Sequence, residues 1–350
     1  MNTVELINQF STPLLKWFDL YGRKDLPWQL PREPYRVWVS EIMLQQTQVQ
    51  TVIDYFNRFT ARFPTLKDLA HAKEDEVLSL WSGLGYYSRA RNLHLSAQMI
   101  MEQYQGIFPQ SMELLQKLPG IGPSTAAAIL SQAFNQPEAI LDGNVKRVLS
   151  RFFLISGWPE QAQVKKTLWR LAQSCMPAYR CADYTQAIMD LGATCCTAKK
   201  PDCSNCPVHI HCLAFKNKEQ HLYPTKKIKQ PVPTQSQQFL VLQNTQGLIY
   251  LEKRPPSGLW GGLWCLPSLG ADQSPLDHIK QEYSLIGEEP QQLIAFKHQF
   301  SHFHLEINAL QIKVRYLKNR IAESNGQWFA KNQLDLLGLA KPTSMILSKL

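Results

Sequence analysis

Two short segments of this chain decide its fold: LPGIGPSTA (residues 118–126) and LDGNVKR (residues 141–147). In the first segment, Gly120 and Gly122 flank one apolar residue and precede a run of small residues, which predicts a tight turn that opens a helix. Free backbone N–H groups at such a turn bind phosphate without reading base sequence. The segment therefore predicts a helix–hairpin–helix that grips a nucleic-acid backbone, although a plain turn between two helices fits the same residues.

Four cysteines follow these segments with the spacing C-x6-C-x2-C-x5-C: Cys196, Cys203, Cys206 and Cys212. Four thiolates this close together suit either a tetrahedral zinc ion or a [4Fe–4S] cluster, and the spacing alone does not choose between them. Cys195 stands beside the first ligand, and we assign Cys196 because it gives the six-residue gap. Basic side chains between the ligands would let this loop present positive charge to DNA.

Length and composition indicate an ordinary globular protein of two domains, because 350 residues exceed what one hydrophobic core usually serves. The sequence has no apolar run of the roughly 18 residues that a membrane span needs, and the first residues do not resemble a secretory signal. We therefore expect a cytoplasmic protein, nucleoid-associated and without a membrane partner. In a reducing compartment, clustered cysteines indicate metal ligands and not disulfides.

The net charge of +9 is unevenly distributed. Residues 1–231 carry 26 basic and 19 acidic side chains, a balance of +7, whereas residues 232–350 carry 11 and 9, a balance of +2. A basic surface attracts phosphate backbones through counterion release. A solvated basic face without any partner fits the charge alone equally well.

Hydrophobic periodicity predicts a mainly helical region over residues 1–215, followed by a polar, proline-bearing linker over 216–236. The helices are expected at Val4–Leu20, Val37–Phe59, Glu74–Leu80, Ala90–Gln103 and Gln163–Gln173.

After the linker, residues 237–350 predict a smaller α+β domain. Its strands are expected at Gln238–Gln243, Gly247–Glu252, His304–Gln311 and Lys313–Tyr316, with helices near Asp277–Tyr283 and Met345–Leu350.

Two carboxylates stand in contrasting surroundings. Glu41 lies among Val37, Trp38, Ile42 and Leu44, an apolar environment that raises a carboxyl pKa and favours the acid form. Asp142 precedes a glycine and an asparagine, where an aspartate usually caps a helix. Two basic residues follow it within five positions and favour its ionised form. A helix-dipole role for Glu41 and a capping role for Asp142 are the simpler alternatives.

Further motifs carry a resemblance to a known family. They are SEIMLQQTQV (residues 40–49), GLGYYSRARNLH (83–94), ILDGNVKR (140–147), RPPSGLWGGLW (254–264) and FSHFHL (300–305). Together with the cysteine spacing, they resemble the helix–hairpin–helix DNA glycosylases with a [4Fe–4S] loop, and among these the adenine DNA glycosylases of the MutY type. The resemblance implies a six-helix barrel with an iron–sulfur cluster domain, followed by a Nudix-like domain.

The family removes adenine mispaired with 8-oxoguanine or guanine in duplex DNA, acting as a monomer, by hydrolysing the N-glycosidic bond. By this resemblance Glu41 is the acid that protonates the departing base, and Asp142 is the anion that stabilises the oxocarbenium-like transition state. The four cysteines hold the [4Fe–4S] cluster.

The resemblance also assigns residues that bind and evert the base. The positions that match the family's adenine pocket are Trp28, Asn144 and Gln186; those that match its DNA wedge are Gln46, Leu84 and Tyr86; and those that contact the DNA backbone are Gly120, Gly122 and Ser124.

Ser124 implies a monofunctional enzyme. Bifunctional relatives carry a lysine two residues after the second glycine of the hairpin, where it forms a Schiff base and the strand is cut. Here a serine occupies that position, so we expect the abasic site to be left intact. Lys146 is a remaining source of slight lyase activity.

The C-terminal domain is expected to read damage and not to hydrolyse nucleotides. A Nudix pyrophosphatase needs a helix of the REXXEE type to hold metal, and Ala271–Glu289 has only Glu282 well inside its expected helix. The resemblance assigns recognition of 8-oxoguanine to Phe300, Ser301 and His302, with His304 as a further contact; capping or pairing within a strand is the alternative for these polar residues.

Three other functions fit parts of the sequence. The first is a thymine or uracil mismatch glycosylase on the same scaffold. The second is a catalytically silent DNA-binding protein with a structural or redox cluster. The third is a nucleotide pyrophosphatase with a DNA-binding N-terminus, which the missing glutamates disfavour.

Overall fold

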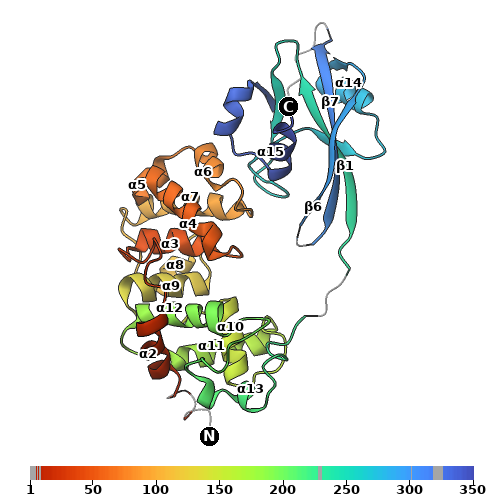
Figure 1. Ribbon diagram of the computed structural model, residues 1–350. Helices are drawn as coiled ribbons and strands as arrows, with labels where there is room; N and C mark the ends of the chain where they lie inside the picture. The colour runs from red at the N-terminus through yellow and green to blue at the C-terminus, as the bar shows by residue number, and fades with distance from the viewer. Residues whose placement is uncertain (1–4, 6, 8, 228–230, 301, 318–325) are drawn as a thin grey trace. The chain divides into compact units, whose positions relative to one another are not determined.

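The computed structural model describes residues 1–350 apart from 1–4, 6, 8, 228–230, 301 and 318–325 (Figure 1). The chain forms two compact units. Unit 1 comprises residues 1–70 and 95–228, and unit 2 comprises residues 71–94 and 229–350. The predicted order, a mainly helical region followed by an α+β domain, is confirmed.

Helices build unit 1. Those that lie wholly or mainly in it are α2 (Ser11–Tyr21), α3 (Pro34–Leu44), α4 (Val49–Arg62), α5 (Leu66–His71), α7 (Ser88–Gln103), α8 (Met112–Gln116), α9 (Pro123–Phe134), α10 (Gly143–Phe152), α11 (Ala162–Cys175), α12 (Cys181–Asp190) and α13 (Leu213–Lys216). A π-helical turn, η1 (Leu191–Cys195), and a 3-10 turn, η2 (His209–His211), lead through the cysteine segment.

The predicted hairpin connects α8 to α9. Gly120 has a φ of 79°, a left-handed conformation that glycine adopts without steric cost. Gly122 is the N-cap of α9, and Pro123 at the first helical position has no N–H to leave unsatisfied. The backbone therefore turns sharply between α8 and α9, as the sequence predicts.

One predicted helix is wrong. The apolar pattern over Val37–Phe59 predicts one helix, but the structure has two, α3 and α4, separated at Gln45–Gln48. Gln46 has a φ of 60°, which no right-handed helix accommodates, so the helix must end there. The predicted helices Glu74–Leu80, Ala90–Gln103 and Gln163–Gln173 are confirmed within two residues at each end. The predicted helix Val4–Leu20 is confirmed only over α2, Ser11–Tyr21, because Gln9 and Phe10 form a turn; Val4, Leu6 and Asn8 lie outside the described residues.

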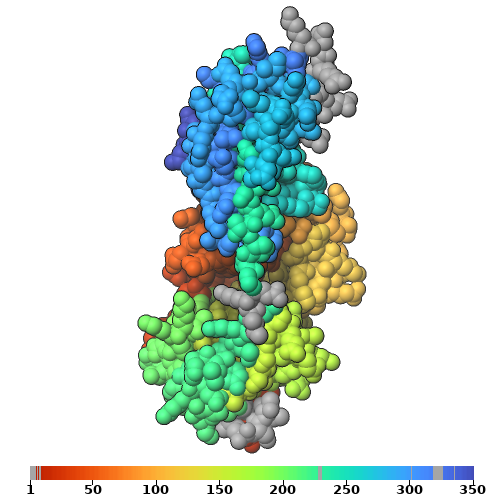
Figure 2. Space-filling view, turned by 90° about the vertical axis from the view of Figure 1, so that its right-hand side faces the viewer, coloured from red at the N-terminus to blue at the C-terminus, as the bar shows by residue number. Residues whose placement is uncertain are grey.

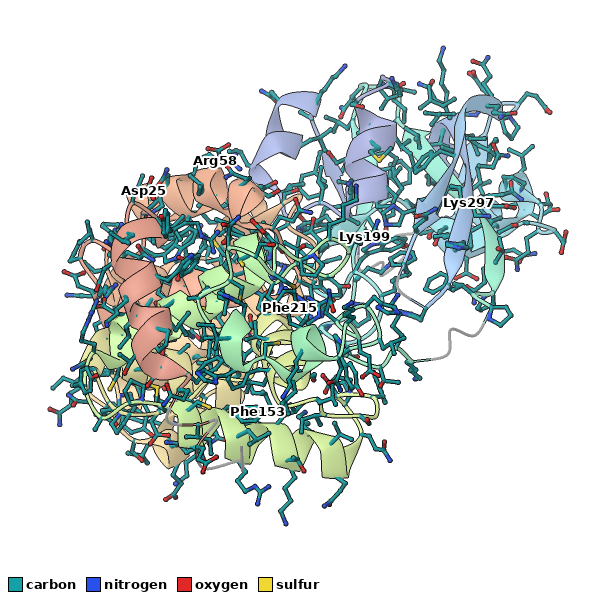
Figure 3. All side chains as sticks on the ribbon, turned by 60° about the horizontal axis from the view of Figure 1, so that its bottom comes forward. Asp25, Arg58, Phe153, Lys199, Phe215 and Lys297 are labelled. Atoms are coloured by element: carbon teal, nitrogen blue, oxygen red, sulfur yellow. The ribbon has the colours of Figure 1, made fainter. Side chains whose placement is uncertain are left out.

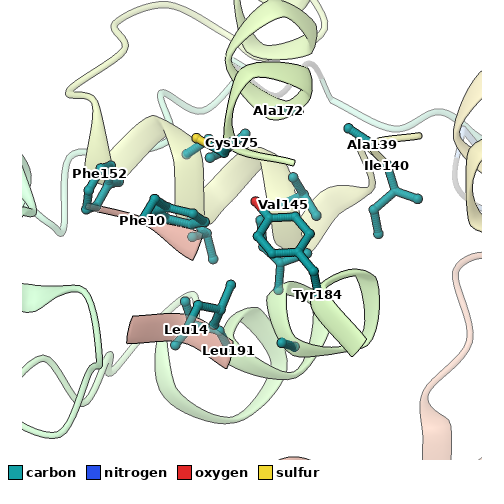
Figure 4. Close-up of a cluster of buried hydrophobic side chains, with 14 of the residues drawn as sticks. Phe10, Leu14, Ala139, Ile140, Val145, Phe152, Ala172, Cys175, Tyr184 and Leu191 are labelled. Atoms are coloured by element: carbon teal, nitrogen blue, oxygen red, sulfur yellow. The ribbon is translucent and has the colours of Figure 1, made fainter. Parts of the chain in front are cut away.

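A buried apolar cluster fixes α10 within unit 1 (Figure 4). Val145 of α10, Phe10, Leu14 of α2 and Tyr184 of α12 all contribute to it and are almost fully buried. The rings of Phe10 and Phe152 meet edge to face with centroids 4.9 Å apart. Because Val145 is three residues from Asp142, this packing holds the start of α10 in place.

Unit 2 consists of α6 (Glu74–Trp81), the start of α7 and the C-terminal domain. The strands are β1 (Thr234–Gln243), β2 (Ile249–Lys253), β3 (Trp264–Cys265), β4 (Ser268–Gly270), β5 (Leu285–Gly287), β6 (Gln291–Gln299), β7 (His304–Tyr316) and β8 (Gly326–Phe329). The remaining elements are α14 (Pro275–Tyr283), η3 (Lys331–Leu336) and α15 (Lys341–Leu347).

The sheet of unit 2 separates two apolar cores. Its strands follow the order β3-β2-β1-β7-β5, and the central β1 and β7 are parallel. Alternate residues of β1 point to opposite faces: Phe239 and Val241 pack with α15, whereas Leu240 and Leu242 pack with α14. The two strands predicted at His304–Gln311 and Lys313–Tyr316 are one continuous strand, β7.

The segment after α13 lies against the surface of unit 1 (Figure 2). The Gly157 N–H donates to Thr225 Oγ1 at 3.1 Å, and the Lys227 ammonium lies 5.0 Å from the centre of the Trp158 ring. Arg151 Nε donates to the carbonyls of Gln220 and Tyr223, both at 2.9 Å. Residues 217–227 are therefore bound to unit 1. None of the described helices is both long and apolar enough to cross a bilayer.

Candidate functional site

Glu41 meets its hydrogen-bond partner between α3 and α9. Gln132 Nε2 of α9, itself buried, donates to Glu41 Oε1 at 2.9 Å. Burial raises the pKa of Glu41 to about 7, the bond from Gln132 opposes the rise, and the charge of Asp142 adds to it. The structure thus brings the two predicted carboxylates together, and Glu41 can hold a proton near neutral pH.

Asp142 is the N-cap of α10. Its Oδ1 accepts from the Val145 N–H at 2.8 Å and its Oδ2 from Asn144 Nδ2 at 3.2 Å. Burial raises the pKa of Asp142 above its usual value, and these two bonds and the charge of Arg147 offset that rise only in part. The position at a helix N-terminus also favours the anion.

One detail of the sequence interpretation is wrong. Lys146 was expected to favour ionisation of Asp142, but its Nζ pairs with Glu160. Arg147 is the basic residue that acts on Asp142.

Arg147 connects the start of α10 with the cysteine segment. Its Nη2 donates to Asn144 Oδ1 at 2.8 Å and to the Gly192 carbonyl at 2.6 Å, and its Nε donates to the Cys196 carbonyl at 2.8 Å. A Cβ on Gly192 would lie 2.5 Å from the Asn144 Cβ, so only glycine allows this approach. Asn144 is thereby held between Arg147 and Asp142.

Ser124 forms a hydrogen bond with the backbone next to Asp142. Its Oγ accepts from the Leu141 N–H at 3.1 Å, so the position that bears a lysine in bifunctional relatives here ties α9 to the residue before the cap. In the same hairpin, Gly120 forms the turn and Gly122 is the N-cap of α9.

The other predicted pocket residues are buried. Trp28 meets Phe56 edge to face at 5.4 Å. Gln186 Nε2 donates to Asp190 Oδ1 at 2.7 Å, while its Oε1 is buried and has no partner among the described residues. Asp190 also forms an ion pair with Arg23 at 2.6 Å.

Sequence reasoning missed two residues. Gln132 lies in an apolar helix and carries no motif that would single it out. Gln29 is 1% exposed, and neither its Nε2 nor its Oε1 has a partner within the described part of the chain. Buried amide groups without partners are costly, so such a side chain marks a place where a ligand can bind. Its position next to Trp28 was the available signal.

The predicted wedge residues belong to different units. Gln46 forms the break between α3 and α4 in unit 1. Leu84 and Tyr86 lie in the segment 71–94 of unit 2, where Leu84 is buried and Tyr86 is 49% exposed. Tyr86 has a φ of 48° and lies over the Arg89 guanidinium at 5.6 Å.

The four predicted cysteines line one cavity with Arg151. Burial, with smaller contributions from Cys196, Cys206 and Cys203, raises the pKa of Cys212 to about 12. Among the described residues, no three His, Cys, Asp or Glu side chains converge closely enough to hold a single metal ion.

The two neighbouring cysteines, Cys195 and Cys196, have different hydrogen-bond partners. Arg151 Nη1 donates to Cys196 Sγ at 3.3 Å, which stabilises a thiolate. The Cys195 thiol instead donates to the Asp202 carbonyl at 3.1 Å. Lys199 and Lys200 are exposed and directly precede Pro201 and Asp202, which line the cavity (Lys199 is labelled in Figure 3).

Two of the predicted recognition residues, Phe300 and His302, line a cavity in unit 2. Tyr86, Trp260, Phe300 and His302 are among the residues that line it. Phe300 stacks on Phe303 with centroids 4.5 Å apart and planes at 18°. Ser301 lies outside the described residues. His304 is the first residue of β7 and does not line this cavity.

Comparison with known proteins shows which families match the two parts of the chain. Residues 39–174 match the HhH-GPD superfamily base excision DNA repair proteins, and residues 238–349 match the NUDIX domain. The chain is 40% identical to a protein of Buchnera aphidicola subsp. Acyrthosiphon pisum named "Adenine DNA glycosylase", over 97% of this chain and 96% of that protein. It is also 40% identical to the protein of the same name from Homo sapiens, over 75% of this chain and 58% of that protein.

A solved structure described as a thermostable thymine-DNA glycosylase resembles 61% of this chain and 98% of its own, with a TM-score of 0.54 and 26% identity. A DNA complex of endonuclease III resembles 62% of this chain and 99% of its own, with a TM-score of 0.53 and 23% identity, which supports the fold.

Proposed function

Since this chain belongs to the adenine DNA glycosylases, enzymes of base excision repair that hydrolyse the N-glycosidic bond of adenine in DNA, we propose that it removes adenine from A:8-oxoguanine and A:guanine mispairs and leaves the abasic strand intact. The observation that carries this proposal is the pair formed by Glu41 and Asp142. Burial raises the pKa of Glu41 to about 7, so this carboxyl can hold a proton near neutral pH, whereas Asp142 accepts two hydrogen bonds at the N-terminus of α10.

Glu41 is the general acid. It gives its proton to a ring nitrogen of the everted adenine, and the C1′–N9 bonding electrons leave with the base. Asp142 stabilises the positive charge that develops on the sugar. Water then adds to C1′ and returns a proton to the Glu41 carboxylate, so both side chains regain their starting states. Gln132 holds the Glu41 carboxyl in place through its 2.9 Å bond.

The adenine pocket draws on two glutamines. Within the described part of the chain, the buried amide of Gln29 and the buried side-chain oxygen of Gln186 have no hydrogen-bond partner. An amide can donate to one ring nitrogen of a purine and accept from its amino group. Trp28 adds an aromatic surface close by in sequence, and Asn144 positions Asp142.

Recognition of 8-oxoguanine is assigned to the cavity of unit 2. Phe300 and Trp260 supply flat apolar surfaces, and Tyr86 and His302 supply polar groups at the same cavity. Hydrolysis by this domain is disfavoured because the helix α14 contains Glu282 as its only glutamate, and the Tyr283 hydroxyl at its end donates to Glu252 at 2.7 Å.

The cysteine cavity suits a [4Fe–4S] cluster, because the side chains of Cys196, Cys203, Cys206 and Cys212 all line it. Such a cluster supplies structural cross-linking of the loop, and the loop presents Lys199 and Lys200 to phosphates. The hairpin residues Gly120 and Gly122 supply backbone N–H groups to the same double-stranded DNA, which the protein binds as a monomer.

The test is release of free adenine from a duplex with a central A:8-oxoguanine pair, resolved on a gel after alkali treatment. Wild-type protein should release adenine, and Glu41→Gln should not. Three control duplexes carry A:guanine, A:T and T:G. Release of thymine from T:G with adenine retained would assign the chain to a mismatch glycosylase of another specificity and refute the proposal.

A further inference from the structure

The connection between α10 and α11 carries Glu160, which forms ion pairs with a lysine of each helix. Glu160 Oε1 pairs with Lys146 Nζ, and Glu160 Oε2 pairs with Lys165 Nζ at 3.4 Å. The Lys146 side chain is only 15% exposed, whereas that of Glu160 is 41% exposed. Its lysine partners hold the pKa of Glu160 below its usual value, so the carboxylate is ionised at neutral pH.

Lys146 lies one helical turn after Asp142 in α10. It follows Asp142 by four residues, and its N–H donates to the Asp142 carbonyl at 3.0 Å in the first turn of α10. Side chains four residues apart lie on the same side of a helix. An abasic sugar held beside Asp142 would therefore be within reach of the Lys146 side chain, which is long and flexible.

We propose that Glu160 is a positioning residue that holds Lys146 Nζ away from the abasic product and so suppresses strand cleavage. This inference rests on the proposed function for the identity of the product, but the chemistry that it concerns follows adenine removal. Glu160 is assigned no role in protonating the base, because its two carboxylate oxygens pair with Lys146 and Lys165.

The suppressed reaction needs only the lysine and water. A free amine attacks C1′ of the ring-opened sugar, an N–C1′ bond forms, and one water leaves to give an iminium ion. Loss of a C2′ proton then expels the 3′ phosphate with the electrons of the C3′–O bond, and water hydrolyses the imine to release the lysine. Borohydride reduces the iminium to a stable amine, which cross-links protein to DNA.

Glu160→Gln is the primary test variant. It removes one carboxylate and keeps the shape of the side chain. Borohydride trapping is measured on a duplex with a preformed abasic site, which does not depend on adenine excision. Partly exposed ion pairs contribute about 0.2–1 kcal/mol, so the trapped yield should rise roughly 1.5- to 5-fold. Glu160→Asp should restore the wild-type yield in part.

Two controls identify the cause of a rise. Glu113→Gln breaks another Glu–Lys pair, that with Lys117 at 3.0 Å, and changes the net charge by the same amount, so it should leave trapping unchanged. Glu160→Gln combined with Lys146→Ala should lose the extra yield. Adenine release by Glu160→Gln, measured in parallel, should match the wild type.

Two outcomes overturn the inference: a yield in Glu160→Gln equal to that of the wild type, or a rise that persists in the double variant. Failure of the wild type to release adenine from the A:8-oxoguanine duplex refutes the proposed function separately, because the trapping substrate is already abasic.

Discussion

Glu41→Gln should make the protein more stable at neutral pH and abolish its activity. The pKa of Glu41 rises from 4.5 to about 7 on folding. At about 1.4 kcal/mol for each pKa unit, this rise corresponds to roughly 3 kcal/mol. Because the folded pKa lies above the unfolded one, the folded state retains a proton that the unfolded state loses, so stability falls as the pH rises between these two values.

Glutamine carries no such charge and can still accept the bond from Gln132. The free energy of unfolding of Glu41→Gln relative to the wild type should therefore grow by about 1–3 kcal/mol between pH 4.5 and pH 8 and then stay level. Thermal melting across this range measures the difference, with Glu102→Gln at an exposed site as the matched control. Adenine release should fall by a factor on the order of 100 to 10,000, the usual contribution of a general acid.

A difference in stability that does not change with pH would refute the reasoning, because it would show that Glu41 titrates alike in the folded and unfolded states. Retained activity in Glu41→Gln would refute its role as the acid. The two measurements are independent, since one follows the free energy of folding and the other the reaction.

Three further predictions concern other parts of the molecule. Gln132→Leu removes a bond that lowers the pKa of Glu41, so the alkaline limb of the pH–rate profile should move to higher pH by about one unit; an unchanged limb would show that the bond is unimportant. Cys206→Ser should lose the absorbance of an iron–sulfur cluster near 400 nm, whereas Cys195→Ser should keep it, and the opposite result would reverse the ligand assignment. A chain that ends after Lys227, which retains the contacts with unit 1, should lose its preference for 8-oxoguanine over guanine before it loses adenine release; equal losses would place the discrimination elsewhere.

Motifs that act through the local backbone were predictable from the sequence. The hairpin at Gly120 and the helix cap at Asp142 each depend on residues within five positions, and the cysteine spacing confines the ligands to one loop. The bond from Gln132 to Glu41 joins residues 91 positions apart, and nothing in an alanine-rich helix distinguishes that glutamine. The helix break at Gln46 was missed because the apolar period continues across it.

The prediction that Lys146 favours the ionised form of Asp142 was wrong for a similar reason. A sequence shows which charges are near one another along the chain. It does not show that Glu160, in the connection between α10 and α11, forms an ion pair with Lys146. Gln29 was missed because a polar residue beside a tryptophan does not indicate its own burial.

The anchoring of residues 217–227 leaves few residues between unit 1 and β1, which begins at Thr234. Unit 2 also contains residues 71–94, so the chain passes between the two units at three places along its sequence. Two binding surfaces that are covalently joined act at a high effective concentration toward each other. Engagement of a lesion by one unit therefore favours engagement by the other, and the time spent at each candidate base pair is set by dissociation of the whole chain.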